Sequence, residues 1–95
     1  MIPSNRTPSH PGEILLEEFL LPMGLPQLTL AEKLDIRVQR VNEIVRGKRG
    51  ITPETAWMFA DAFGTTPEFW MNLQAMHDLA RMKPKRRVRP LMKVG

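Results

Sequence analysis

Five residues in the middle of the chain have side chains suited to reading the edges of DNA base pairs. Arg37, Gln39 and Arg40 lie at the start of a short segment with helical apolar periodicity, together with Val38 and Asn42. In the major groove, Arg can pair with guanine, Gln or Asn can pair with adenine, and an apolar group can contact the thymine methyl. A helix that offers its N-terminal end to the groove would use these residues for base readout. The alternative for each is an exposed side chain without a ligand.

Four further residues are candidates for contacts with the phosphate backbone. Gln27 is placed to open a helix, where backbone N–H groups and a side-chain amide can meet a phosphate. Arg46, Lys48 and Arg49 follow the base-reading segment in a glycine-containing loop. Their alternative interpretation is a solvated run of charges. Five of the seven Lys and Arg residues in positions 1–80 fall between positions 37 and 49, which indicates a basic footprint for nucleic acid.

Two short helices that cross at roughly 90 to 120° would hold these side chains in place. Counted from Gln27, the fifth position is Ala31, which is small enough for the helices to approach closely. The predicted inward-facing residues are Leu30, Leu34, Ile36, Val41 and Ile44. Asp35 occupies the turn position that usually takes glycine because φ there tends to be positive, and Asp is one of the few other residues that tolerates this conformation. The pattern predicts a helix-turn-helix.

Start and stop signals along the chain predict five helices, hence an all-α fold. The predicted helices begin after Ser9–His10, after Pro26, at Arg37 or Val38, after Thr52 and after Thr66. A competing capping-box pattern, Thr29 with Glu32, would shorten the second helix, but would leave too few turns for its apolar face. The expected stops are Pro22 with Gly24 for the first helix, then Gly47, Gly64 and Pro84 for the last three.

The charge distribution divides the chain into three parts. Residues 1–80 hold 7 Lys or Arg and 10 Asp or Glu, whereas residues 81–95 hold 7 Lys or Arg and no acid. We expect a flexible N-terminal arm at residues 1–8, a helix-turn-helix domain at residues 9–83, and a basic, disordered tail at residues 84–95. The tail could bind nucleic acid, contact an acidic partner or serve as a solubilising end.

The last predicted helix carries more large apolar residues than one face of a small bundle requires. It is therefore expected to contribute to a homodimer, because helix-turn-helix proteins commonly read two half-sites as symmetric dimers. The candidate dimer-interface residues are Phe69, Trp70, Leu73 and Met76. For Trp70 and Leu73 the alternative is a place in the core of a single chain.

Composition argues against several other classes of function. The chain has 95 residues, no cysteine and two histidines, so no metal-ligand set and no thiol or His-paired catalytic pattern is expected. We therefore expect no enzyme activity, no cofactor and no metal site. The longest apolar stretch is far shorter than the roughly 20 residues that span a bilayer, and residues 1–11 do not resemble a secretory signal. A cytoplasmic protein without a membrane segment is expected.

Three sequence strings resemble the HigA-type antitoxins, a branch of the XRE or lambda-repressor-like helix-turn-helix family. They are HPGEILLEEFL at 10–20, VNEIVRGKRGIT at 41–52 with Gln39 and Arg40 before it, and FGTTPEFWMNLQ at 63–74. The resemblance implies a compact five-helix, dimeric DNA-binding repressor that autoregulates its operon and neutralises a HigB-type ribonuclease toxin. A stand-alone repressor and a protein-interaction module with incidental DNA affinity are the alternatives. Pro26 and Arg37 stand where the family usually has Ser caps, and Val38 where it often has Arg.

Overall fold

The computed structural model of the chain describes residues 8–92, and all of its regular secondary structure in that range is helical. The elements are α1 (Pro11–Ile14), η1 (Leu15–Leu20), α2 (Leu21–Met23), α3 (Gln27–Leu34), α4 (Val38–Val45), α5 (Pro53–Phe63) and α6 (Pro67–Arg81). Because α1, η1 and α2 follow one another without a break, the described part of the chain has five helical bodies, as predicted. The predicted arm at residues 1–8 lies outside the described residues except for Pro8.

The first helix ends at Gly24, one of the two residues predicted to stop it, which has φ of 58° and caps the helix in the left-handed conformation. The other predicted stop residue, Pro22, does not interrupt the helix. The six residues before α2 form the π-helical segment η1, and the N–H of Leu21 donates to the carbonyl of Leu16, five residues back. A proline ring collides with the carbonyl four residues before it in a regular α-helix. The wider π turn provides room for the ring, so the helix passes Pro22.

Helices α3 and α4 form the predicted helix-turn-helix, and α3 begins at Gln27 rather than at the competing Thr29 cap. Asp35 has φ of 56° and ψ of 47°, which confirms the left-handed turn expected at this position. The N–H of Ile36 donates to the carbonyl of Ala31 at 3.0 Å and closes the turn. Ala31 is buried, so the two helices meet closely there.

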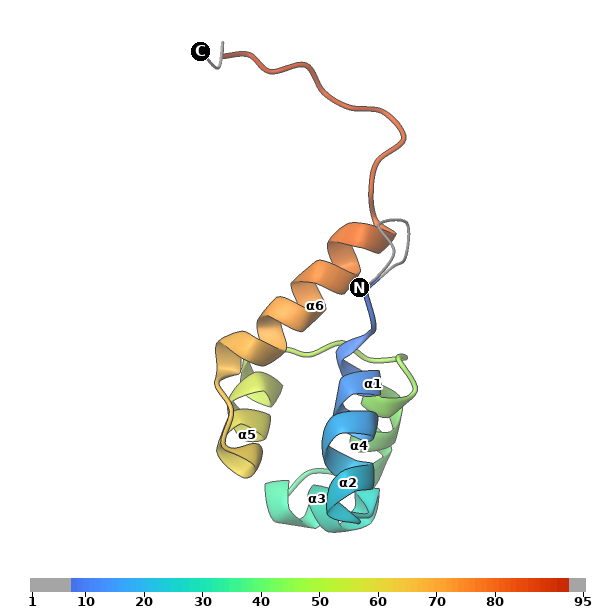
Figure 1. Cartoon of the computed structure of the whole chain (residues 1–95), viewed down its shortest axis with the longest axis vertical. Helices are drawn as coiled ribbons and strands as arrows, with labels where there is room; N and C mark the ends of the chain where they lie inside the picture. Colours follow the sequence, from blue (N-terminus) through green and yellow to red (C-terminus); the bar gives the residue numbers. More distant parts are fainter. Residues whose placement is uncertain (1–7, 93–95) are drawn as a thin grey trace.

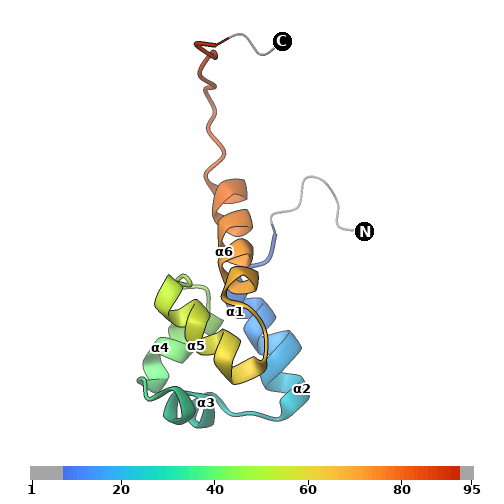
Figure 2. The ribbon, with the colours of Figure 1, turned by 90° about the vertical axis from the view of Figure 1, so that its left-hand side faces the viewer.

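The core lies between the helix-turn-helix and the last two helices. Its fully buried side chains include Leu15, Leu30, Val41, Phe59 and Trp70, drawn from every helical body. In Figure 1, α5 stands beside the group formed by α1 and α4, and α6 crosses above them. Figure 2, turned by 90°, looks onto α5 with α4 at its edge. Leu34 and Ile36 pack against this core but stay partly exposed.

The placement of Trp70 corrects one prediction. The side chain has no exposed surface, and its indole N–H donates to Thr65 Oγ1 at 2.8 Å. Trp70 therefore belongs to the core of a single chain and has no surface left for a dimer partner. Leu73 is also partly buried against the core, whereas Met76 is exposed.

The N-terminus of α1 is capped by a histidine that also contacts α6. The Nδ1 atom of His10 accepts a hydrogen bond from the Gly12 N–H at 2.9 Å, and its ring lies edge-on to His77 with centroids 5.0 Å apart. Burial and then the nearby His77 lower the pKa of His10, with a smaller contribution in the same direction from Arg81; only Asp78 opposes them.

The lowered pKa of His10 predicts a loss of stability in mild acid. An ordinary histidine has a pKa of 6.5, so as the pH is lowered His10 takes up its proton in the unfolded chain before it does in the folded chain. The free energy of unfolding therefore decreases as the pH is lowered from about 6.5 to the pKa of His10 in the folded chain. Protonation also removes the Nδ1 acceptor that caps α1. Urea midpoints at pH 7.5 and 5.5 measure this effect. His10→Asn, which keeps a capping acceptor without this titration, should lose less between the two pH values; an equal loss would contradict the prediction.

The last helix ends at Arg81, three residues before the predicted stop at Pro84. Residues 83–92 have no helix and extend away from the end of α6, as Figure 1 shows. No single helix among residues 8–92 is long and apolar enough to cross a membrane. The helices Pro11–Met23 and Gln27–Leu34 reach that length and apolar composition only when taken together, and the angle between them is 101°.

Candidate nucleic-acid interface

The N-terminal end of α4 projects three of the predicted base-reading residues from the surface. Arg37 is the N-cap residue, with extended backbone (φ −70°, ψ 140°) and no side-chain hydrogen bond that caps the helix. Val38 and Gln39 follow it, and all three side chains are exposed. Since Arg caps a helix poorly and a cation is unfavourable near a helix N-terminus, Arg37 weakens α4 locally. A contact with an anion would offset this penalty.

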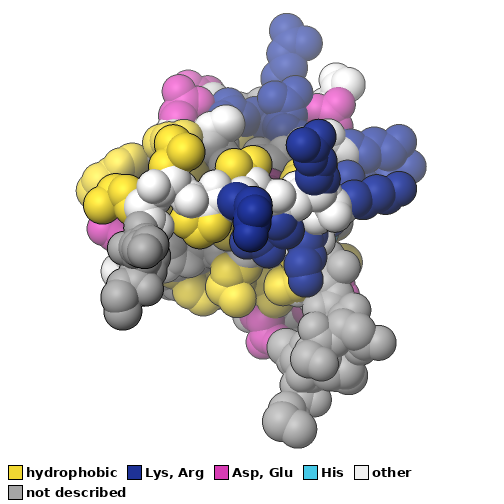
Figure 3. Space-filling model, turned by 90° about the horizontal axis from the view of Figure 1, so that it is seen from above, with side chains coloured by type: hydrophobic (Ala, Val, Ile, Leu, Met, Phe, Trp, Pro, Cys, Tyr) yellow, Lys and Arg dark blue, Asp and Glu magenta, His cyan; other side chains and the backbone are white. Residues whose placement is uncertain are grey.

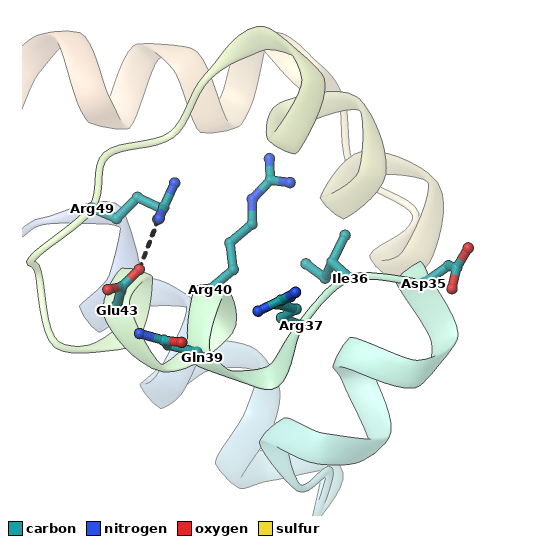
Figure 4. Close-up of a pocket in the computed structure, with 7 residues that line it drawn as sticks. All are labelled: Asp35, Ile36, Arg37, Gln39, Arg40, Glu43 and Arg49. Atoms are coloured by element: carbon teal, nitrogen blue, oxygen red, sulfur yellow. Dashed lines mark hydrogen bonds and ion pairs between the residues drawn. The ribbon is translucent and has the colours of Figure 1, made fainter.

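A polar hollow of about 480 Å³ lies beside these residues. Figure 4 shows its seven lining residues, which come from the helix-turn-helix turn, α4 and the loop after it. They are Asp35, Ile36, Arg37, Gln39, Arg40, Glu43 and Arg49. Three arginines and two carboxylates line the hollow. Arg40 and Arg49 are each paired with a carboxylate, so among residues 8–92 Arg37 is the lining arginine that a polyanion could contact directly.

One predicted phosphate contact is held by an ion pair within this hollow. The guanidinium of Arg49 donates to Glu43 Oε1 through Nε at 3.0 Å and Nη2 at 2.9 Å. Glu43 thus forms an ion pair with the loop that follows its own helix. Arg46 and Lys48 are exposed, and neither forms an ion pair within residues 8–92.

Arg40, in contrast, turns away from the exposed face of α4 and binds the start of α5. Its Nη2 atom donates to Glu54 Oε1 at 3.0 Å and to Thr55 Oγ1 at 2.8 Å. Figure 4 shows the Arg40 side chain extending from α4 towards α5. Only 25 % of the Arg40 side chain is exposed, and its Nε atom is buried without a partner. This arrangement corrects the prediction that Arg40 reads bases: the side chain is engaged in joining α4 to α5.

Replacing Arg40 with alanine is expected to lower the free energy of unfolding by about 1–2 kcal/mol. Most of the loss comes from the buried Thr55 hydroxyl, because the Glu54 carboxylate is largely exposed and an exposed ion pair contributes little. Glu54→Gln, the matched control, should therefore cost under about 0.5 kcal/mol. Urea unfolding followed by circular dichroism measures both. Equal losses for the two variants would show that the ion pair dominates.

Gln27 and Asn42, predicted as phosphate-binding and base-reading residues, are hydrogen-bonded to each other. Asn42 Nδ2 donates to Gln27 Oε1 at 3.2 Å and thereby links α4 to the start of α3. This bond occupies the Gln27 oxygen and leaves its NH₂ group as the donor that a phosphate could accept. Asn42 is half-buried, so it is placed less openly than Gln39.

The basic loop after α4 is fixed at both ends. Gly47 has φ of 74°, and the N–H groups of Lys48 and Arg49 both donate to the carbonyl of Glu43, at 2.8 and 3.2 Å. At the far end, the Ile51 N–H donates to Gln74 Oε1 of α6 at 2.7 Å. The loop therefore presents its cations from a defined backbone.

Three residues that hold this interface in place were not predicted from the sequence. Glu54, Thr55 and Gln74 bind the reading helix or the basic loop from α5 and α6, 14 to 23 residues away along the chain. No local pattern marks such contacts. The buried hydroxyl of Thr55, one helical turn after the Thr52 cap, is visible only once the helices are packed.

Basic side chains also gather at the end of the molecule from which the tail leaves. Figure 3 views the molecule from the end at which the tail leaves, and Lys and Arg side chains gather at its centre and upper right. Six of the residues from 81 to 92 are Lys or Arg. Among the described residues there is no group of three or more His, Asp or Glu side chains that could hold a metal ion.

The packing of α3 on α4 and the exposed end of α4 define a helix-turn-helix domain. The family model described as Helix-turn-helix matches residues 16–70. The chain is 40 % identical over 76 residues to antitoxin HigA-1 of Vibrio cholerae, covering 80 % of this chain and 71 % of that protein. The solved structure of Pseudomonas aeruginosa antitoxin HigA with the higBA promoter matches with a TM-score of 0.82 and 37 % identity, over 90 % of this chain and 99 % of that one. This chain belongs to the HigA-type antitoxins of the helix-turn-helix family.

The chain is also similar to a protein that is not named as an antitoxin. The chain is 50 % identical over 70 residues to Virulence-associated protein I of Dichelobacter nodosus, covering 74 % of this chain. The matched region spans 65 % of that protein's length, just under two thirds.

Proposed function

We propose that the chain binds operator DNA as a homodimer, represses its own operon and neutralises a HigB-type ribonuclease toxin. It acts in the cytoplasm, has no catalytic role, and needs no cofactor. The observation that carries the proposal is the exposed end of α4, with Arg37, Val38 and Gln39, next to a polar hollow lined by three arginines. The Pseudomonas aeruginosa HigA structure, solved with promoter DNA, supports the same use of this fold.

The residues divide into two kinds of contact. Arg37, Val38 and Gln39 are proposed to read bases, with Asn42 in a supporting position behind them. The proposed phosphate contacts are Gln27, Arg46, Lys48 and Arg49. Arg49 would exchange its Glu43 partner for a phosphate, so Glu43 opposes binding to any duplex and favours sites with enough base contacts to compensate.

The proposal is tested by fluorescence anisotropy with two duplexes. One is the DNA upstream of the reading frame that encodes this chain, and the other is a scrambled duplex. We expect a preference of roughly a thousandfold for its own DNA. Gln39→Ala should weaken operator binding by about tenfold to a hundredfold with little change on the scrambled duplex. Arg46→Ala should weaken binding to both and lower the salt slope by about 1. Lys33→Ala removes an exposed charge from α3 outside the hollow and should change neither.

Equal and steeply salt-dependent binding to both duplexes would overturn the repressor assignment. Only the basic charge would then be acting, and a protein-interaction module would be the better description.

Neutralisation of a toxin is tested separately by co-expression with the ribonuclease encoded beside this chain. Growth should be restored by the wild type and by Gln39→Ala alike, because base reading is not needed to bind a protein. Loss of both activities in Gln39→Ala would show that the DNA-reading surface also contacts the toxin. If the neighbouring frames encode no ribonuclease, the chain is a stand-alone repressor.

A further inference from the structure

Residues 83–92 carry positive charge that no carboxylate of the described chain neutralises. Five of these ten residues are Lys or Arg, and no Asp or Glu occurs after Asp78. All ten are exposed and have no helix or strand. None of their basic side chains forms an ion pair within residues 8–92. We call residues 83–92 the tail segment, and its cations are Lys83, Lys85, Arg86, Arg87 and Arg89.

The tail segment begins close to the loop that holds most of the proposed phosphate contacts. His77 of α6 lies edge-on to His10, with ring centroids 5.0 Å apart. The His10 ring packs against the loop after α4, because a Cβ atom at Gly47 would lie 3.7 Å from His10 Cγ. Arg81, the last residue of α6, follows His77 by one turn on the same face. The tail segment therefore leaves α6 on the side where the basic loop lies, and Figure 1 shows this loop running below α6.

The basic loop and the tail segment form a continuous region of positive charge. Arg46 and Lys48 of the loop are exposed and form no ion pair within residues 8–92. The acidic neighbour at the end of α6, Asp78, already accepts a hydrogen bond from Gln74 Nε2 at 2.9 Å. Figure 3 views this end of the molecule and shows Lys and Arg side chains at its centre and upper right. Positive charge thus continues from the loop through Arg81 into the tail segment.

We infer that the tail segment binds the phosphates of the DNA that flanks the half-site, independently of base sequence. The inference rests on the operator binding in the proposed function and adds a second contact to it. Pro84 and Pro90 disfavour a helix, so the segment stays extended. An extended chain spans at most about 3.3–3.6 Å per residue, so these residues can cover about one turn of DNA.

The chemistry of the tail segment fits a polyphosphate better than a folded acidic partner. Four of the five residues at positions 85–89 are cations, and three of these are Arg, whose guanidinium can donate two parallel hydrogen bonds to one phosphate. Duplex DNA carries one negative charge per about 1.7 Å of helix axis, so the segment finds partners in any register. A folded protein offers carboxylates at fixed positions, and fixing the segment against them would cost about 1–2 kcal/mol per residue.

Two triple variants separate contacts made by charge from contacts made by apolar side chains. The arginine variant, Arg86→Gln, Arg87→Gln and Arg89→Gln, removes three charges. The apolar variant, Val88→Ser, Leu91→Ser and Met92→Ser, removes the side chains that a protein groove or a membrane would bind. All six residues are exposed and outside the helices, so both variants should keep the wild-type urea midpoint.

Fluorescence anisotropy across a salt series measures the effect of each variant. The arginine variant should weaken binding to the operator and to the scrambled duplex by the same factor, about tenfold or more at about 0.1 M salt. Its salt slope should fall by about 2–3, because each lost phosphate contact lowers the slope by about 0.9. The apolar variant should change neither quantity. An unchanged slope in the arginine variant, or equal losses in the two variants, would overturn the inference.

The length of the duplex provides an independent readout. Adding about ten base pairs of unrelated sequence to each side of the operator should raise the affinity of the wild type severalfold, because the tail segment gains phosphates to bind. The arginine variant should gain much less. An equal gain in the wild type and the arginine variant would show that the tail segment does not contact flanking DNA.

The ratio of operator affinity to scrambled-duplex affinity distinguishes failure of this inference from failure of the proposed function. If the wild type prefers the operator and the arginine variant matches it on both duplexes, the inference fails and the repressor assignment stands. If the wild type binds both duplexes equally and the arginine variant binds both more weakly, the tail segment binds DNA and the operator-specific function fails. Gln39→Ala added to the arginine variant should multiply the two separate losses, because the two contacts are independent.

Discussion

Replacing Gly12 with alanine is expected to prevent the chain from folding stably. A Cβ atom at this position would lie 1.7 Å from the carbonyl oxygen of Ile44, 2.6 Å from its carbonyl carbon and 3.0 Å from Val45 Cα. These are backbone atoms of α4, so no rotamer change can relieve the contact, and α1 would have to move away from α4. Overpacking of flexible core side chains costs about 1–3 kcal/mol, and we expect at least about 3 kcal/mol here.

Urea unfolding followed by circular dichroism measures the loss, with Gly64→Ala as the matched control. Gly64 has φ of 70° but no atom within 4 Å of an added Cβ, so its substitution should cost only about 1 kcal/mol of backbone strain. Operator binding should be lost with Gly12→Ala because Ile44 lies in the helix that carries Gln39. A wild-type urea midpoint for Gly12→Ala would show that α1 can be displaced at little cost.

Trp70→Ala is expected to lower the free energy of unfolding by about 3–5 kcal/mol. The indole is fully buried among four aromatic rings, with centroids at 5.1 Å to Phe59 and Phe69 and at 5.3 Å to Phe19. Alanine would leave a cavity that rigid rings cannot fill, together with the unpaired hydroxyl of Thr65. The loss should affect α5 and α6 together, because Trp70 of α6 packs against Phe59 of α5.

Two variants separate the contributions to this loss. Trp70→Phe keeps most of the buried ring but removes the donor to Thr65, and should cost about 1–2 kcal/mol. Trp57→Ala, measured at a concentration where the chain is monomeric, should change the free energy of unfolding by under about 0.5 kcal/mol, because the side chain is exposed. Equal effects of Trp70→Ala and Trp57→Ala would contradict the burial seen in the structure.

The sequence was sufficient to predict the features that depend on neighbouring residues. Helix starts at Pro11, Pro53 and Pro67 follow from a capping residue placed before a proline, and all three are found. The left-handed turn at Asp35 was predicted in the same way, from the conformation that the motif requires. Such signals are carried by a few adjacent side chains and survive in almost any tertiary context.

The features that the sequence could not predict depend on contacts between distant residues. Whether Arg40 points to DNA or to α5 depends on Thr55, fifteen residues later, and an arginine offers no local sign of its partner. Trp70 and Trp57 are both large apolar residues on amphipathic helices, and only the packed structure shows which one is exposed. Pro22 is a stop signal in a regular helix, and the π-helical segment that accommodates it consists of the six residues Leu15–Leu20.

The bonds from Arg40 to Glu54 and Thr55 have a consequence for the length of the operator. They join α4 to α5, so each α4 helix of the proposed dimer would keep its orientation relative to the rest of its own chain. DNA turns by about 34° per base pair, given about 10.5 base pairs per turn. One base pair inserted at the operator centre would turn one half-site out of phase with its helix, and the protein could follow only by breaking a contact. The chain would thus be sensitive to the helical phase of its operator as well as to its bases.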